Sequence, residues 1–308
     1  MEAGRSIPEA IERARLAEKL GYDSIWHSQL PGNRDTALVL AAYAQATERI
    51  KFGTAVLPIY TRHATAMAQM AQTLDELSGG RFILGIGVSH KVTVESMWGL
   101  RLESPVETMR EYLEILRASF KEGSASLDGQ YFHAHWSYAA PRNPDLPIYV
   151  AALGERMLQL AGEVADGVSL WMCSPNYVRD VVVPRVRRGR ERAGLPLEGF
   201  EIMAAVPVSL AADTQKARDA FRETVKRYAG LPFYRRMLDS SGFADQLARD
   251  EVSDAMLHEL SGIGNAAAVR EAIARYREAG VTLPVVGPLP KSAGAVSVEA
   301  TLEAAIAA

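Results

Sequence analysis

Long amphipathic segments alternate with short apolar runs along nearly the whole chain. The first amphipathic segment, residues 7–20, has the spacing of a helix that buries one face. Ser6 can cap its first turn, Pro8 lies within that turn, and Gly21 follows its end. The same pattern predicts further helices over residues 36–47, 64–77 and 105–120.

The apolar runs predict strands that are buried on both faces, because the runs are continuous and do not alternate with polar residues. We expect seven of them, at residues 22–27, 50–57, 81–88, 148–151, 168–171, 202–208 and 283–286. A helix–glycine–strand junction recurs at residues 17–26, 161–171 and 276–286. Repeated helix-to-strand units favour an α/β fold of the TIM (β/α)8 type, with a doubly wound open sheet as the alternative.

We expect residues 1–308 to form a single domain of this kind. Only five residues precede Ser6, which predicts that the first barrel strand is short or absent. Two segments interrupt the pattern: residues 123–147, which are rich in proline and glycine, and residues 231–262, which read as a helical insertion. Both are expected at the C-terminal face of the strands, where barrel enzymes build their active sites.

Composition excludes several classes of protein. The chain carries 34 Lys+Arg and 37 Asp+Glu, a formal net charge of −3, which argues against a nucleic-acid-binding surface. Its single cysteine, Cys173, allows no internal disulfide or cysteine-based zinc site and fits a reducing compartment. No apolar run approaches the roughly 18 residues of a membrane-spanning helix. We therefore expect a cytoplasmic protein that binds neither nucleic acid nor membrane.

Common catalytic motifs are missing from the chain. Gly85-Ile86-Gly87 begins like a dinucleotide fingerprint, but the third glycine is absent and the pair lies within a predicted strand. Such glycines are more typical of a close approach by a ligand or a neighbouring strand. His133 and His135 lie in an expected loop without a nearby acidic residue, so we expect no metal site there.

Longer segments carry a resemblance to a known family. Residues 54–63 (TAVLPIYTRH) and 74–87 (LDELSGGRFILGIG) resemble the bacterial luciferase-like family, and residues 151–157 and 165–167 add two further matches. Within that family the chain is most similar to the branch that uses the deazaflavin coenzyme F420. The resemblance implies a homodimeric TIM-type barrel that transfers a hydride between the deazaflavin and a small organic substrate.

The family pattern also implies roles for residues at the ends of the second and third barrel strands. The third strand ends in a bulge with a non-prolyl cis peptide that supports the central deazaflavin ring. This position matches Ala55–Val56, with Thr54 and Leu57 on either side. At the end of the second strand, His27 and Gln29 are both candidates to contact the ring and to donate a proton, for which a histidine pKa near neutrality is suited.

At the end of the fourth strand, the resemblance places Val88 and Ser89 along the ring edge. Some relatives carry a carboxylate where His90 stands, so His90 is a candidate acid or base, or a ligand for an anionic part of the cofactor. The helix after the fifth strand opens at a position that matches the site of the cofactor tail. Its residues are Ala152, Leu153 and Gly154, followed by Arg156 and Met157, with Arg62 as a further cationic candidate.

Two alternative functions stay open at this point. The first is an FMN-dependent monooxygenase of the same superfamily, which activates oxygen and needs a flavin reductase as a partner. The second is a barrel that binds cofactor without turnover. A deazaflavin enzyme needs no metal, because the organic ring itself carries the hydride while the protein orients the substrate and manages a proton.

Overall fold

The computed structural model describes residues 6–306, and the chain divides into two compact units. The first unit contains the residues up to Ala151 together with Val164–Gly167, and the second contains Ala152–Glu163 and the residues from Val168 onward. The expectation of a single domain therefore stays a prediction. Residues 1–5, where a short first strand was expected, lie outside the described residues. No helix within the described range is both long and apolar enough to cross a membrane.

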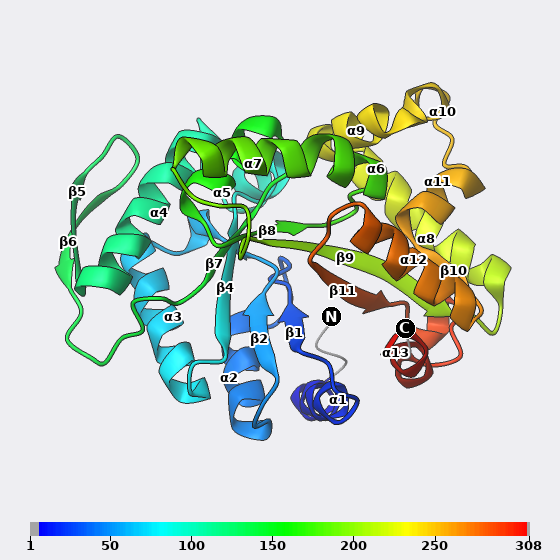
Figure 1. Cartoon of the computed structure of the whole chain (residues 1–308), viewed down its shortest axis with the longest axis horizontal. Helices are drawn as coiled ribbons and strands as arrows, with labels where there is room; N and C mark the ends of the chain where they lie inside the picture. Colours follow the sequence, from blue (N-terminus) through cyan, green and yellow to red (C-terminus); the bar gives the residue numbers. More distant parts are fainter. Residues whose placement is uncertain (1–5, 307–308) are drawn as a thin grey trace. The chain divides into compact units, whose positions relative to one another are not determined.

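A parallel sheet with the strand order β1-β2-β4-β7 forms the core of the first unit (Figure 1). The four strands predicted for this part of the chain are confirmed, with the one predicted over residues 50–57 divided into β2 and β3. The five strands are β1 (Ser24–His27), β2 (Lys51–Thr54), β3 (Leu57–Pro58), β4 (Phe82–Gly87) and β7 (Ile148–Ala151). The helices of the first unit are α1 (Ile7–Lys19), α2 (Thr36–Ala46), α3 (Ala64–Ser78) and α4 (Pro105–Glu122), with a 3-10 turn at Ile59–Thr61 and a π-helical turn at Val92–Met97. Each predicted helix is confirmed.

The strand predicted over residues 50–57 is interrupted by a β-bulge. Residues 52–53 pair with residues 82–83 of β4, whereas β3 pairs with residues 86–87. The sequence offset between partners falls from 30 to 29, so β2 and β3 together hold one residue more than the part of β4 that they face. The Ala55–Val56 peptide within the bulge is cis. The predicted bulge and its cis peptide are both confirmed.

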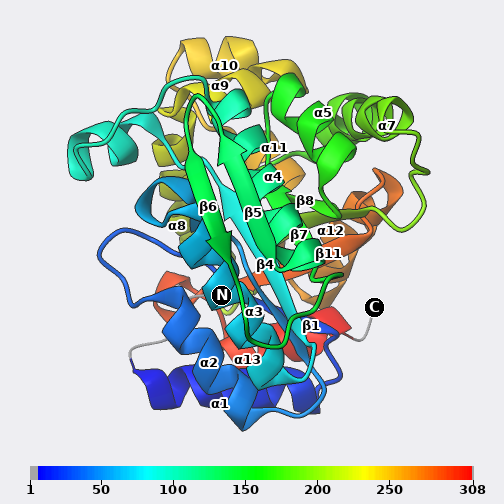
Figure 2. The ribbon, with the colours of Figure 1, turned by 90° about the vertical axis from the view of Figure 1, so that its left-hand side faces the viewer.

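Residues 123–147 contain an antiparallel hairpin that the sequence analysis did not predict (Figure 2). It consists of β5 (Ser124–Asp128) and β6 (His133–Ser137). The segment follows helix α4 and not a strand, so it does not begin at the carboxyl edge of the sheet. Its turn is held by the Glu111 carboxylate of α4, which accepts backbone N–H bonds of 2.8–2.9 Å from residues 130–132. This end of the hairpin contacts the start of α3, where the Phe132 ring lies against His63.

In the second unit, the long strand β9 lies between β8 and β10 and also pairs with β11. The strands are β8 (Gly167–Leu170), β9 (Glu201–Leu210), β10 (Gly262–Gly264) and β11 (Leu283–Pro288). The remaining helices are α5 (Glu155–Val164), α6 (Pro175–Tyr177), α7 (Val183–Arg192), α8 (Thr214–Ala229), α9 (Pro232–Leu238), α10 (Ala244–Ala248), α11 (Asp254–Leu260), α12 (Ala266–Glu278) and α13 (Val298–Ile306), with further turns at Val178–Val182, Asp239–Phe243 and Lys291–Ala293.

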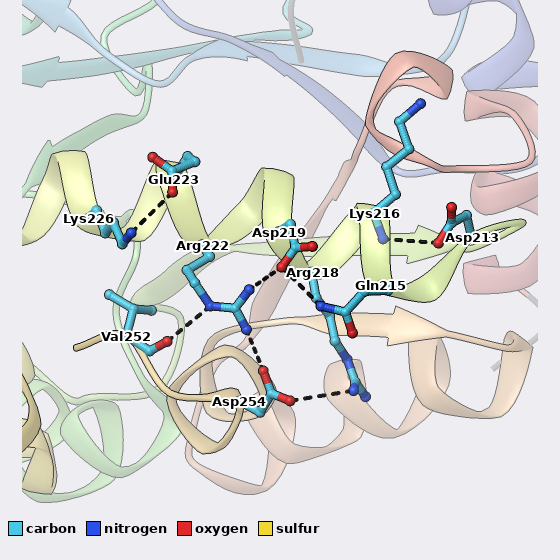
Figure 3. Close-up of polar contacts among 10 residues, drawn as sticks. All are labelled: Asp213, Gln215, Lys216, Arg218, Asp219, Arg222, Glu223, Lys226, Val252 and Asp254. Atoms are coloured by element: carbon cyan, nitrogen blue, oxygen red, sulfur yellow. Dashed lines mark hydrogen bonds and ion pairs between the residues drawn. The ribbon is translucent and has the colours of Figure 1, made fainter.

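The three strands predicted for the second unit are confirmed, and so is the helical character of residues 231–262. Strand β10 was not predicted, because a three-residue run with two glycines carries no hydrophobic pattern. The helical insertion lies between β9 and α12 and is fastened to α8 by Arg222 (Figure 3). The Arg222 guanidinium pairs with Asp219 and Asp254 and donates to the Val252 carbonyl at 3.0 Å.

Helix α5 crosses α7 through two glycines. A Cβ atom at Gly162 of α5 would lie 2.3 Å from the Val186 carbonyl oxygen, and one at Gly189 of α7 would lie 2.1 Å from the Gln159 carbonyl oxygen. Both distances are far below van der Waals contact with backbone atoms. The two helix backbones therefore approach as closely as only glycine allows, and this contact places α5 within its unit.

Arg81 joins the amino-terminal ends of the first unit's strands to two helix ends. Its Nε donates to the Ser78 carbonyl at 2.8 Å. Its Nη1 donates to the Thr47 hydroxyl and the Ile50 carbonyl, and its Nη2 donates to the carbonyls of Ala44 and Thr47, at 2.9–3.0 Å. One guanidinium therefore satisfies acceptors at the ends of α2 and α3 and at the start of β2.

An Arg81→Met variant is expected to lower the free energy of unfolding by about 3 kcal/mol, because several half-buried acceptors lose a charged donor at once. Urea denaturation followed by circular dichroism measures this change. Arg101→Met is the matched control, since the Arg101 side chain is 85% exposed. A loss no larger in Arg81→Met than in the control would show that water replaces these hydrogen bonds without cost.

Candidate active site

The carboxyl ends of β1, β2 and β4 meet at one edge of the first unit's sheet. His27 and Thr54 are register partners, and the Ala55 N–H donates to the His27 carbonyl at 2.8 Å. Because β3 pairs with residues 86–87, Val88, Ser89 and His90 follow directly beside the bulge. The structure therefore brings together the strand-end residues that the sequence analysis selected.

Two of these residues have side chains that are fully buried. Leu57 packs in the core, and the hydroxyl of Thr54 donates to the Gly85 carbonyl at 2.6 Å and accepts the Gly85 N–H at 2.8 Å. Ala55 and Val56, which lie between them, are partly exposed. Contact with a bound molecule at this point would be made by the Ala55–Val56 part of the bulge.

The chain turns sharply after β4. Ser89 has a φ of 59°, in the left-handed region that residues other than glycine seldom adopt. The carbonyl of His90 then accepts N–H bonds of 2.9 Å from Thr93 and Val94. Burial lowers the pKa of His90, because a desolvated imidazole is less readily protonated. At neutral pH the His90 ring is therefore uncharged and can accept a proton.

His27 is 4% exposed, and its ring lies 6.4 Å from the Tyr43 ring of α2. Its neighbour Trp26 is directed to the opposite face of the sheet, since successive strand residues alternate. There Trp26 covers Gly53, at which a Cβ atom would lie 2.4 Å from the indole, and stacks on Tyr149 at 5.4 Å. His27 thus faces the helices that cover the sheet.

Gln29 and Arg62 are both engaged within the loops at this edge. The Gln29 side-chain oxygen accepts the Thr36 N–H at 2.9 Å, at the start of α2. Asp35 caps the same helix and pairs with the Arg62 guanidinium. The Arg62 carbonyl accepts a 2.9 Å bond from Tyr112. The Asp35–Arg62 ion pair therefore connects the loop after β1 to the loop after β3.

The residues matched to the cofactor tail lie in the second unit, around the start of α5. Ala152 and Met157 are buried, whereas Gly154 and Arg156 are exposed. The Leu153 carbonyl accepts a 2.8 Å bond from the Tyr177 hydroxyl. A Cβ atom at Gly154 would meet nothing within 4 Å, so there is free space beside the backbone at the start of this ten-residue helix. Open backbone N–H groups at a helix start can bind an anion.

The prediction that the paired histidines have no acidic neighbour is wrong. The hairpin places Asp128 opposite His133, and the Asp128 carboxylate lies 2.9 Å from Nε2 of His135. The sequence does not reveal this partner, because the pattern of residues 123–147 predicts a loop and not a hairpin. Within residues 6–306, no three or more histidine, cysteine or acidic side chains gather in a way that could hold a metal ion.

The candidate residues predicted from the sequence do not include Asp35, Tyr112 and Tyr177. Each acts through a backbone or side-chain partner that lies 24 to 50 residues away in the chain. Burial raises the pKa of Tyr177 to about 12, so its hydroxyl stays protonated and donates to Leu153. No local sequence pattern marks such contacts, and only the fold reveals them.

The chain is similar to a known family, to known proteins and to solved structures. The family model described as luciferase-like monooxygenase matches residues 1–283. The chain is 32% identical to a 5,10-methylenetetrahydromethanopterin reductase of Methanolobus tindarius, over 89% of this chain and 88% of that protein. The coenzyme F420-dependent tetrahydromethanopterin reductase of Methanopyrus kandleri superposes with a TM-score of 0.84 and 26% identity, over 99% of this chain and 95% of that one.

A structure that contains FMN shares the fold. The oxygenating constituent of 3,6-diketocamphane monooxygenase from Pseudomonas putida, solved with FMN, superposes with a TM-score of 0.77 at 21% identity, over 99% of this chain and 93% of that one. These superpositions confirm the predicted α/β fold of the TIM-barrel type. The chain therefore belongs to the luciferase-like monooxygenase family and, within it, to the branch of coenzyme F420-dependent oxidoreductases.

Proposed function

We propose that this protein binds coenzyme F420 and catalyses hydride transfer between the deazaflavin and a small organic substrate. One structural observation carries the proposal: the half-buried Ala55–Val56 bulge lies beside Ser89 and His90 at the carboxyl ends of parallel strands. Ligands of parallel α/β folds bind at this end of the strands. The similarity to F420-dependent reductases supports the choice of cofactor.

The residues at this edge fit a flat, uncharged ring. Ala55 and Val56 present small apolar side chains, while the polar side chain of Thr54 is withdrawn into hydrogen bonds with Gly85. The bulge and residues 88–89 would hold the ring, and Gln29 would flank it from the loop after β1. When bound, the deazaflavin supplies or accepts the hydride.

His90 is the proposed proton-transfer group. Its depressed pKa keeps the imidazole neutral near pH 7, in the state that accepts a proton from a substrate hydroxyl as the hydride leaves. In the reverse direction the imidazolium returns that proton to the substrate oxygen. The proposed catalytic role of His27 stays a prediction, and its packing against Tyr43 favours support of α2 as its main task.

Taken by itself, the second unit offers backbone N–H groups near Gly154, at the start of α5, that would bind an anionic group. Arg156 is exposed in the same turn and adds positive charge. Ala152 and Met157 are buried, so they would support this site through packing and would not contact the anion with polar groups. Leu153 is held in place by Tyr177.

Titration of the purified protein with F420 and, separately, with FMN tests the proposal. We expect saturable F420 binding at micromolar concentration, equivalent to about 8 kcal/mol, and FMN binding at least tenfold weaker. Absorbance and fluorescence of the two cofactors report the binding. Tight binding of FMN alone would overturn the proposal in favour of a flavin monooxygenase, which oxygen uptake with reduced FMN would then show.

A substrate screen with reduced and oxidised F420 separates an enzyme from a barrel that only binds the cofactor. Turnover of any small carbonyl compound or alcohol, followed at the F420 absorbance band, supports hydride transfer. Cofactor binding without turnover, with no effect of His90→Ala on the cofactor's spectrum, would favour the non-catalytic alternative. The homodimer and the cytoplasmic location stay predictions, and light scattering of the purified protein measures the first.

A further inference from the structure

The hydroxyl of Thr54 is enclosed at the point where β2 ends. Thr54 is fully buried, and its Oγ makes two hydrogen bonds with one residue, donating to the Gly85 carbonyl at 2.6 Å and accepting the Gly85 N–H at 2.8 Å. Both a lone pair and the proton of the hydroxyl are therefore used within the protein. The family resemblance assigned Thr54 to cofactor binding, but this side chain has no exposed atom to offer a ligand.

The register of the sheet explains why Gly85 needs this partner. Leu84 donates its N–H to the Pro147 carbonyl on the β7 side, so the N–H and carbonyl of the next residue, Gly85, are directed to the β2 side. Regular pairing with β2 stops at residue 83, and pairing with β3 resumes at residue 86. At this gap in the pairing, the Thr54 hydroxyl bonds both groups of Gly85, accepting from its N–H and donating to its carbonyl.

The contact is too close for any other residue at position 85. A Cβ atom there would lie 1.8 Å from the Thr54 carbonyl oxygen and 3.2 Å from Cγ1 of Val56. Because Gly85 has no side chain, the bulge can pack against β4, and the Thr54 hydroxyl holds the bulge in that position. Since Ala55 follows Thr54 directly, the position of this hydroxyl sets where the Ala55–Val56 part of the site begins.

We propose that Thr54 is a positioning residue. Through its two hydrogen bonds to Gly85, it fixes the bulge that forms the contact surface for the bound ring. The inference rests on the proposed function only in stating that the bulge contacts the ring of F420. The hydrogen bonds and their effect on the backbone belong to the protein without cofactor. Substitutions that keep or remove the Thr54 hydroxyl therefore test separately whether Thr54 holds the bulge and whether the bulge contacts the cofactor.

The first measurement is amide hydrogen exchange at Gly85 in the cofactor-free protein. Thr54→Val keeps the shape of the side chain but removes both hydrogen bonds, and we expect the Gly85 amide to exchange at least about tenfold faster. Thr54→Ser keeps the hydroxyl and should retain the protection. Thr36→Val is a matched control, because Thr36 is also fully buried while its hydroxyl has no hydrogen-bond partner among the described residues.

The second measurement is F420 affinity. We expect Thr54→Val to weaken binding about tenfold or more, with Thr54→Ser and Thr36→Val within about twofold of the unmodified protein. If Thr54→Val does not fold, Thr54→Ala is measured in the same way. Unchanged exchange at Gly85 would overturn the positioning role. Lost protection of the Gly85 amide with unchanged F420 affinity would show that the bulge does not form the contact surface for the ring. If the unmodified protein does not bind F420, the proposed function fails, but the exchange result still decides the role of Thr54.

Discussion

A Gly85→Ala variant is expected to lose F420 binding by a factor of about 100 or more and to unfold with a free energy lower by about 3–5 kcal/mol. The added Cβ would lie 1.8 Å from the carbonyl oxygen and 3.0 Å from the carbonyl carbon of Thr54. Both are backbone atoms, so a change of rotamer cannot relieve the overlap. Either β2 separates from β4 or the bulge is displaced, and both outcomes disrupt the same edge of the sheet.

Chemical denaturation and cofactor titration of one protein sample measure the two effects of Gly85→Ala. Gly230→Ala is the control, since a Cβ there would be 3.4 Å from its nearest neighbour, the Arg227 carbonyl oxygen, and the residue has an ordinary helical conformation. Full stability together with normal affinity in Gly85→Ala would show that the backbone tolerates the added methyl. In that case the bulge geometry described above would be incorrect.

A His90→Gln variant is expected to lower the rate of hydride transfer at saturating cofactor and substrate by about 100-fold, the usual contribution of a general acid or base. Glutamine retains hydrogen-bonding capacity but cannot accept a proton. F420 affinity should change by less than about threefold. Stopped-flow absorbance of the deazaflavin measures the rate, and His133→Gln is the control, because the His133 side chain lies on the hairpin and is 71% exposed.

The opposite pattern would assign His90 another role. Weaker F420 binding with an unchanged rate at saturation would make His90 a ligand for an anionic group and not a proton acceptor. His27→Asn is measured alongside, and a rate loss in that variant alone would exchange the roles of the two histidines. An unchanged rate of hydride transfer in both variants would show that neither histidine takes part in proton transfer.

The pH dependence of stability gives an independent test of His90. Burial depresses its pKa in the folded state, whereas in the unfolded chain it returns to about 6.5. As the pH falls below that value, the unfolded chain takes up a proton that the folded protein does not. Stability present above the unfolded pKa is therefore lost as the pH falls toward the folded pKa, and His90→Gln should remove that part of the acid destabilisation.

The general fold could be predicted from the sequence because its strands are continuous apolar runs with helices between them. All seven predicted strands are present, whereas β10 and the β5–β6 hairpin were not predicted. A three-residue strand is too short for a pattern, and the exposed hairpin strands do not bury a continuous apolar face. Hydrophobic patterning identifies the longer elements of the core, and it misses both a three-residue strand of the main sheet and an exposed hairpin.

The candidate site was predictable in position but not in the direction of its side chains. His27 and His90 both lie at strand ends, as expected, yet only the alternation along β1 shows that His27 faces Tyr43. Similarly, the resemblance located Thr54, but the use of its hydroxyl depends on a register between strands that are 31 residues apart. Such facts follow from tertiary pairing, which no local pattern contains.

The position of Arg81 has a consequence for how this protein can evolve. Its hydrogen bonds gather helix ends at the amino-terminal side of the strands, while the candidate site occupies their carboxyl ends. Selection for heat resistance and selection for a new substrate can then act on different residues. In a library of variants of the first unit, we expect stability-enhancing changes near Ala44, Thr47 and Ser78 to combine freely with specificity changes around residues 88–90.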